Sequence, residues 1–178
     1  CKALGGPKGI GSTADVIKCV DYALANNAHV INLSLGGGAF SHSAFDAYQR
    51  AQGKGVLVVA AAGNDRRNTD LYKHFPANYE LDNIVSVGNH NYLDIRSEGS
   101  NFGEHTVDLF APGENIHSTS FTGGYNKLSG TSMAAPHVSG VLALLKAHFP
   151  NESYLTLRHR ILGSTTLVSS YLGLAVTG

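Results

Sequence analysis

The residues best suited to chemistry lie in residues 130–140, where a serine follows Gly130 and Thr131 and precedes a run of helix-forming residues. The glycine predicts a tight bend before a helix, which places Ser132 in the first helical turn. Backbone N–H groups in that turn lack helical partners and lie at the positive end of the helix dipole. A hydroxyl there could attack a carbonyl whose developing oxyanion is stabilised nearby. Taken alone, the pattern equally fits a Ser or Thr that only caps the helix.

A second candidate, Asn64, follows a long apolar run at residues 56–62 and a glycine at position 63. Such a run is typical of a strand buried on both faces of a parallel sheet. Ligands of open α/β sheets bind beyond the carboxyl ends of the strands, where this asparagine lies. Its amide could donate a hydrogen bond to an oxyanion. The alternative is an ordinary turn asparagine.

Both stretches resemble the subtilisin-like serine proteases. Residues 130–140 resemble the nucleophile motif, and residues 58–64 resemble the oxyanion-hole segment that precedes it in the chain. The resemblance implies an endopeptidase in which Ser132 forms the acyl-enzyme, while Asn64 and the Ser132 N–H hold the oxyanion. The motif is not the GxSxG elbow of α/β-hydrolases, because Ala134 stands where that elbow needs its second glycine.

Residues 30–37 resemble the strand along which this family binds an extended peptide by adding it to the sheet. The resemblance implies six substrate-binding residues, three at the end of this strand and three before Asn64: Ser34, Leu35, Gly36, Ala61, Ala62 and Gly63. Two further questions stay open: whether residues 9–11 form a second segment that binds the substrate backbone, and whether His74 contacts the substrate. The alternative is a core strand that simply ends in a glycine turn.

The catalytic Asp and His of the family belong to motifs upstream of the substrate strand, and neither motif occurs in these 178 residues. His137 cannot replace the base, because five helical residues give about 7.5 Å of rise and roughly 140° of rotation from Ser132. We expect His137 to be hydrogen-bonded in the core. The resemblance therefore implies that residues 1–178 are the C-terminal portion of a single subtilisin-like peptidase domain, with the Asp and His located before Cys1.

On this hypothesis the chain alone is inactive, because a serine without a base is a weak nucleophile. Its partners would be a peptide or protein substrate and the N-terminal part of the same domain. The main alternative is a pseudoprotease of the same fold that binds peptides without cleaving them. A second, weaker alternative is a nucleotide-binding α/β protein whose glycine-rich loop would be residues 6–13. It is disfavoured because Gly11 stands where a P-loop needs lysine.

Apolar runs that alternate with amphipathic stretches predict an α/β fold: a mostly parallel sheet flanked by helices on both faces, with its N-terminal part missing. We predict helices at about 12–26, 43–52, 131–148 and 153–162, and strands at 1–4, 30–35, 56–62, 84–87 and 107–110. The third helix mixes small and large apolar residues around its axis, which predicts a central position. Pro136 should leave the Ser132 carbonyl without its usual helical donor.

Composition limits the other functions. The chain is 43% hydrophobic and 15% charged, with a formal net charge of +0 and no Lys/Arg run, so nothing in its charge favours nucleic acid or an anionic membrane. The longest apolar stretch, residues 56–62, is too short to span a bilayer. Cys1 and Cys19 are too few for a disulfide scaffold, and we expect two free thiols that pack as small hydrophobes.

The proposed chemistry requires no cofactor. The resemblance implies a structural calcium ion and a secreted or secretory-pathway protein, although the sequence contains no tight cluster of carboxylates.

Overall fold

The computed structural model describes residues 1–6 and 9–177. Pro7 and Lys8, in the middle of the glycine-rich stretch at residues 6–13, lie outside the described residues. Within these described residues there are four α-helices, a short 3-10 helix and six strands: α1 Thr13–Ala25, β1 Val30–Leu33, α2 His42–Gly53, β2 Leu57–Ala61, β3 Ile84–His90, β4 Leu109–Pro112, β5 Ile116–Thr119, β6 Tyr125–Leu128, α3 Thr131–His148, α4 Tyr154–Gly163 and η1 Ser169–Tyr171.

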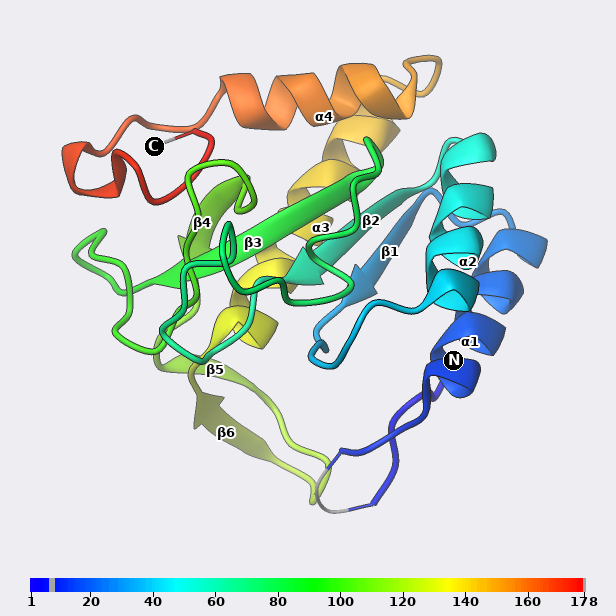
Figure 1. The fold of residues 1–178 in the computed structure, drawn as a ribbon, viewed down its shortest axis with the longest axis horizontal. Helices are drawn as coiled ribbons and strands as arrows, with labels where there is room; N and C mark the ends of the chain where they lie inside the picture. Colours follow the sequence, from blue (N-terminus) through cyan, green and yellow to red (C-terminus); the bar gives the residue numbers. More distant parts are fainter. Residues whose placement is uncertain (7–8, 178) are drawn as a thin grey trace.

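A parallel four-stranded sheet with the order β1-β2-β3-β4 forms the centre of the molecule (Figure 1). Because all three strand pairings are parallel, the carboxyl ends of the four strands lie at one edge of the sheet. β5 and β6 form a separate antiparallel hairpin that leads from β4 into α3. The predicted α/β fold is confirmed.

The alternation of side chains along β2 explains why helices cover both faces. Val58 and Ala60 belong to one apolar cluster with residues of α1 and α2. Leu57 and Val59 belong to a second cluster with residues of α3 and α4. Successive strand residues point to opposite faces, and here both faces are buried. The two layers of helices therefore hold the carboxyl end of β2 in a fixed position.

Helix caps set the starts of the first two helices. The Ser12 hydroxyl accepts a hydrogen bond from the Asp15 N–H at 3.1 Å, which confirms the predicted start of α1. The Ser41 hydroxyl accepts from the Ala44 N–H at 3.3 Å, so α2 begins one residue earlier than predicted. β4 lies two residues later than predicted, because its residues 109–112 pair with residues 87–90 of β3.

α3 is central on one side only. Ala134, Ala135 and Leu142 are fully buried against the sheet. On another side of the same helix, Val141 and Leu144 are 46% and 72% exposed. The predicted central position holds for the side that packs on the sheet, whereas the described residues leave the side with Val141 and Leu144 exposed. In the described part of the chain, no helix is both long and apolar enough to cross a membrane.

Candidate active site

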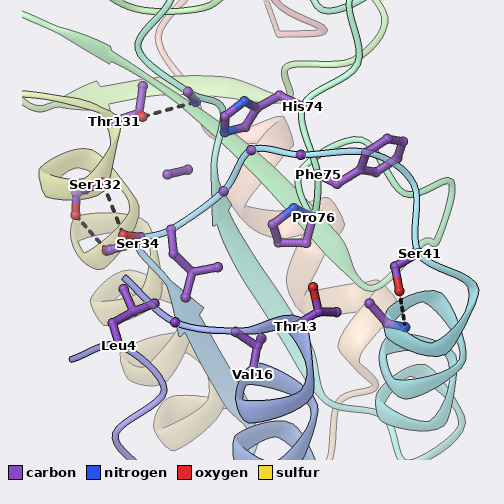
Figure 2. Close-up of a pocket in the computed structure, with 18 of the residues that line it drawn as sticks. Leu4, Thr13, Val16, Ser34, Ser41, His74, Phe75, Pro76, Thr131 and Ser132 are labelled. Atoms are coloured by element: carbon purple, nitrogen blue, oxygen red, sulfur yellow. Dashed lines mark hydrogen bonds between the residues drawn. The ribbon is translucent and has the colours of Figure 1, made fainter. Parts of the chain in front are cut away.

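A groove of about 630 Å³ opens at the carboxyl ends of β1 and β2 (Figure 2). Its walls come from the ends of these strands, the N-terminal segment, the loop that follows His74 and the start of α3. Among its lining residues are most of the predicted site residues: Ser34, Leu35, Gly36, Ala61, Gly63, Asn64 and Ser132. Residues 9–11 and His74, whose contact with a substrate was left open, also line the groove. Ser132 and Asn64, 68 positions apart, thus face one cavity.

Ala62 is the exception among the predicted site residues. It does not line the groove, because its side chain packs with Val107 and Ala175. Its carbonyl accepts a hydrogen bond of 2.9 Å from the Asn101 side chain. Ala61 and Gly63, on either side of it, face the groove, as the alternation of an extended chain requires.

Ser132 stands in the first turn of α3, as predicted. Gly130 has φ +144°, a conformation that L side chains rarely adopt, and a Cβ on this residue would lie 3.2 Å from the Asn64 Oδ1. Glycine at position 130 therefore lets the helix start approach the end of β2 closely. The Ser132 N–H lies in the turn where the helix supplies no acceptor, and it is available to a bound group.

Two hydrogen bonds join Ser132 to Ser34 at the end of β1. The Ser34 hydroxyl donates to the Ser132 carbonyl at 2.7 Å, and the Ser132 hydroxyl donates to the Ser34 carbonyl at 3.2 Å. Pro136 has no N–H for the Ser132 carbonyl, as the sequence predicted, and the Ser34 hydroxyl takes that place. The pair fixes the nucleophile candidate against the predicted substrate strand.

Thr131 orients Asn64, a role that the sequence motifs did not predict. The Thr131 N–H donates to the Asn64 Oδ1 at 2.9 Å, and the Thr131 hydroxyl does so at 3.2 Å. Since the amide oxygen is held on one side, the Nδ2 donor is directed elsewhere, and no described residue accepts a hydrogen bond from it. The hydroxyl of Thr131 also accepts from the Gly63 N–H at 3.2 Å. A threonine directly before a nucleophile serine is the signal that could have identified this role.

This arrangement can stabilise a negatively charged oxygen but supplies no base. No described histidine ring lies within hydrogen-bonding distance of the Ser132 hydroxyl. The His137 Nδ1 lies 2.9 Å from the Met133 carbonyl, and the residue is exposed. The expectation that His137 lies in the core is therefore wrong, because its side of α3 faces outward.

His74 lies within the groove wall and is only 14% exposed at its side chain. Burial lowers its pKa, while Asp65, whose carboxylate is 3.9 Å from the ring, acts in the opposite direction. In Figure 2 the ring points between the chain segments that carry Ser34 and Thr131. The neutral imidazole thus forms part of the surface that a ligand would meet.

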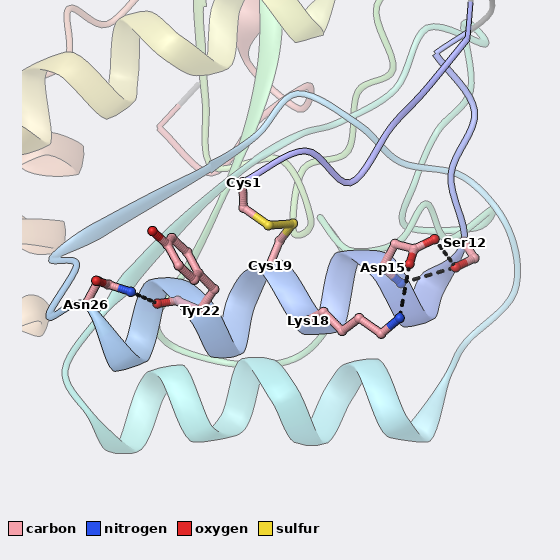
Figure 3. The surroundings of a disulfide bond; sticks show 7 residues. All are labelled: Cys1, Ser12, Asp15, Lys18, Cys19, Tyr22 and Asn26. Carbon is pink, nitrogen blue, oxygen red and sulfur yellow. Dashed lines mark hydrogen bonds and ion pairs between the residues drawn. A yellow bond between two sulfur atoms is a disulfide. The ribbon is translucent and has the colours of Figure 1, made fainter.

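The N-terminal segment forms the other wall, and a disulfide attaches it to α1. Leu4 lines the groove, and Gly5 forms an antiparallel bridge with Ile10. Cys1 and Cys19 are joined, with their Cα atoms 5.4 Å apart (Figure 3). The predictions of two free thiols and of a strand at residues 1–4 are both wrong. The disulfide, together with that bridge, positions this wall in place of strand pairing.

Comparison with known proteins identifies the family. The sequence profile of the Subtilase family matches residues 2–174. The chain belongs to the Subtilase family. It is 43% identical over 157 residues to the major intracellular serine protease of Bacillus subtilis (strain 168). That alignment covers 86% of this chain and 47% of the relative. It is 38% identical over 173 residues to subtilisin Savinase of Lederbergia lenta, and this alignment covers 94% of the chain and 62% of the relative.

Solved structures agree with this assignment. The fold superimposes on a cold-adapted subtilisin-like serine proteinase with a TM-score of 0.85 and 38% sequence identity, over 97% of this subtilase chain and 62% of the other. The chain therefore spans about half to two thirds of the length of these relatives. Its fold is that of the subtilisin-like proteinases.

Proposed function

We propose that this chain carries the nucleophile and the oxyanion hole of a subtilisin-like serine endopeptidase. Ser132 attacks the scissile carbonyl of an extended peptide bound along Ser34, Leu35 and Gly36. The Asn64 Nδ2 and the Ser132 N–H then hold the tetrahedral oxyanion, and loss of the amine leaves an acyl-enzyme that water hydrolyses. The observation that carries the proposal is that Thr131 fixes Asn64 beside the helical turn that presents Ser132.

The base that removes the Ser132 proton comes from a histidine outside this chain, oriented by an aspartate, in a polypeptide segment that completes the domain. Two features support this part of the proposal. β1 lies at the edge of the sheet, so its outer side can accept a further strand. Beside it, α3 exposes Val141 and Leu144, apolar side chains that an added layer would bury. Residues 1–178 then form the C-terminal portion of one peptidase domain.

A pseudoprotease that binds peptides on the same groove is the alternative. It would share the groove and the fold but would lack the histidine or the aspartate in the completing segment. Retention of both Ser132 and Asn64, with the threonine that orients the latter, favours the enzyme, because a peptide-binding protein needs neither an oxyanion donor nor a nucleophile.

The purified chain alone tests the location of the base. We expect it to hydrolyse a casein or peptide substrate no faster than its own Ser132→Ala variant, because nothing in it deprotonates the serine. Addition of the completing segment should restore hydrolysis only to the chain that retains Ser132. Turnover by the chain alone at the rate of a complete protease would refute this part of the proposal.

The chemistry needs no cofactor, because attack, oxyanion binding and proton transfer all use protein groups. A structural calcium ion stays a prediction from the family resemblance. Among the described residues, no three His, Cys, Asp or Glu side chains gather to hold a metal. Secretion is favoured by the disulfide between Cys1 and Cys19, since disulfides persist in oxidising compartments. The relative from Bacillus subtilis is, by its name, intracellular.

A further inference from the structure

We infer that Asn101, in the loop between β3 and β4, is a positioning residue for the oxyanion donor Asn64. The inference rests on the proposed function, because it gives Asn101 a part in presenting the Asn64 amide to the reacting carbonyl. Asn101 is only 1% exposed and does not line the groove. Its effect on the reaction therefore passes through Asn64 and not through contact with a substrate.

The turn that carries Asn64 leaves the sheet and needs hydrogen-bond partners from elsewhere. Its last contact with β3 is the Ala62 N–H, which donates to the Val87 carbonyl at 3.0 Å. Residues 63–67 belong to no strand, so their backbone groups have no ladder of partners beside them. The conformation of the turn is therefore set by whichever groups bind this backbone.

Asn101 holds both peptide groups that flank the Asn64 Cα. On one side, the Asn101 N–H donates to the Gly63 carbonyl at 2.9 Å. On the other side, the Asp65 N–H donates to the Asn101 Oδ1 at 2.9 Å. The orientation of these two peptide groups sets the φ and ψ angles of Asn64, and with them the direction of its Cα–Cβ bond. The Asn64 side chain is thereby directed toward the start of α3, where the Thr131 N–H meets it.

The other hydrogen bonds of the Asn101 side chain hold the rest of the same turn. Its Oδ1 also accepts from the Arg67 N–H at 3.0 Å, and its Nδ2 donates to the Ala62 carbonyl at 2.9 Å. The amide packs directly on the backbone, because a Cβ placed on Gly63 would lie 2.4 Å from the Asn101 Nδ2. Glycine at position 63, with φ +102°, permits this approach.

Asn101 is itself fixed to the sheet. The Ser100 hydroxyl accepts from the Asn89 N–H of β3 at 3.0 Å and donates to the Asn101 carbonyl at 2.9 Å. Two separate supports thus act on the oxyanion donor: Asn101 holds the backbone of Asn64 from the β3 side, and Thr131 holds its side-chain oxygen from α3.

This support matters for catalysis because an oxyanion donor is effective only where the charge develops. A displacement of about 1 Å can cost about 100-fold in rate. Asn101→Ala removes three side-chain hydrogen bonds from the turn. We expect it to lower kcat of the completed protease, this chain together with the segment that supplies the base, by about 10- to 100-fold. KM should change much less, because Asn101 does not touch the substrate.

Amide hydrogen exchange in the 178-residue chain tests the positioning without any chemistry. The Thr131 N–H donates to the Asn64 Oδ1, so its exchange rate reports whether Asn64 stays in place. The matched control is Asn83→Ala. Asn83 is also a fully buried asparagine whose amide donates to a backbone carbonyl, but it lies at the start of β3. We expect Asn101→Ala to raise the Thr131 exchange rate at least about tenfold more than Asn83→Ala does.

A double-mutant cycle in the completed protease tests whether Asn101 acts through Asn64. Added to Asn64→Leu, Asn101→Ala should slow turnover by less than about twofold, because the donor that it positions is already gone. Asn101→Asp keeps the oxygen that accepts the two N–H groups and loses only the donor to Ala62. It should slow turnover less than Asn101→Ala, and it carries the cycle and the exchange measurement if Asn101→Ala does not fold.

An equal rise of Thr131 exchange in the Asn101 and Asn83 variants would show a general loss of stability and would overturn the inference. Additive losses in the cycle would overturn it as well, as would an unchanged kcat in Asn101→Ala. If Asn64→Leu alone left turnover unchanged, the proposed function would be contradicted. The exchange measurement would still show whether Asn101 holds Asn64 in place, so the two failures are distinguishable.

Discussion

Ser34 and Ser132 exchange two hydrogen bonds across the groove: the Ser34 hydroxyl donates to the Ser132 carbonyl at 2.7 Å, and the Ser132 hydroxyl donates to the Ser34 carbonyl at 3.2 Å. The first bond replaces the one that Pro136 cannot make, so the first turn of α3 is completed by a residue of the substrate strand. The candidate nucleophile and the candidate substrate rail are thus parts of one hydrogen-bonded unit.

Ser34→Ala should therefore lower the free energy of unfolding by about 1–3 kcal/mol, because it leaves a partly buried carbonyl without a donor. Urea unfolding measures the effect. Ser118→Ala, at an exposed position of β5, is the control, and we expect it to change stability by less than about 0.5 kcal/mol. Equal effects of the two substitutions would show that the Ser34 bond contributes nothing.

Asn64 and Thr131 should act as a unit in the completed protease. Asn64→Leu should slow acylation by a fluorophosphonate by about 100- to 1,000-fold, a magnitude taken from the loss of an oxyanion-hole asparagine in a subtilisin. Thr131→Val should slow acylation less than Asn64→Leu does, because the backbone N–H of residue 131 still donates to the Asn64 amide oxygen. The double variant should be no slower than Asn64→Leu. Additive losses would mean that Thr131 acts by a route other than Asn64.

The sequence predicted which residues of the site carry its chemistry better than it predicted the hydrogen bonds that join them to distant residues. The resemblance to the subtilisin-like proteases predicted that Ser132 and Asn64 share one site. Their local context agreed with it, because Asn64 follows the carboxyl end of a strand and Ser132 begins a helix. The orphan carbonyl of Ser132 was also predictable, since it follows from Pro136 alone. Its donor was not, because Ser34 is 98 residues away and only the register of β1 beside α3 brings it there.

Other differences have equally local causes. The β5–β6 hairpin was not predicted, because nearly all of its residues are exposed and no alternation of polar and apolar residues marks it. The composition of α3 predicted a central helix, and its sheet-facing side is buried, but Leu144 and Val141 lie on a side that the described residues leave exposed. The pairing of Cys1 with Cys19 depends on where the N-terminal segment returns to α1, and spacing alone does not reveal this.

The Cys1–Cys19 disulfide should contribute about 3 kcal/mol to stability, because the two residues are separated by 18 positions and the cross-link restricts that loop in the unfolded chain. Guanidinium unfolding of the chain with and without reductant measures this contribution. The Cys1→Ser, Cys19→Ser double variant should match the reduced protein and should not respond to reductant. A reduced protein as stable as the oxidised one would contradict the expectation.

His74 should make stability depend on pH below neutrality. Its folded pKa is lowered by burial from the ordinary value of about 6.5, so the unfolded chain binds its proton first as the pH falls. The contribution of the neutral His74 ring to the free energy of unfolding is fully present above about pH 6.5. It is lost as the pH falls from there through the lowered pKa of the folded state. Comparison of urea unfolding at pH 7.5 and pH 5.5 should show a smaller loss in His74→Gln than in the unaltered chain. His105→Gln, at an exposed position, should behave like the unaltered chain.

Labelling of the completed protease by a fluorophosphonate, read by mass spectrometry of its peptides, tests the central claim most directly. The account predicts one adduct, on the hydroxyl of Ser132, and its complete loss in Ser132→Ala. An adduct on another residue, or labelling that persists in Ser132→Ala, would contradict it.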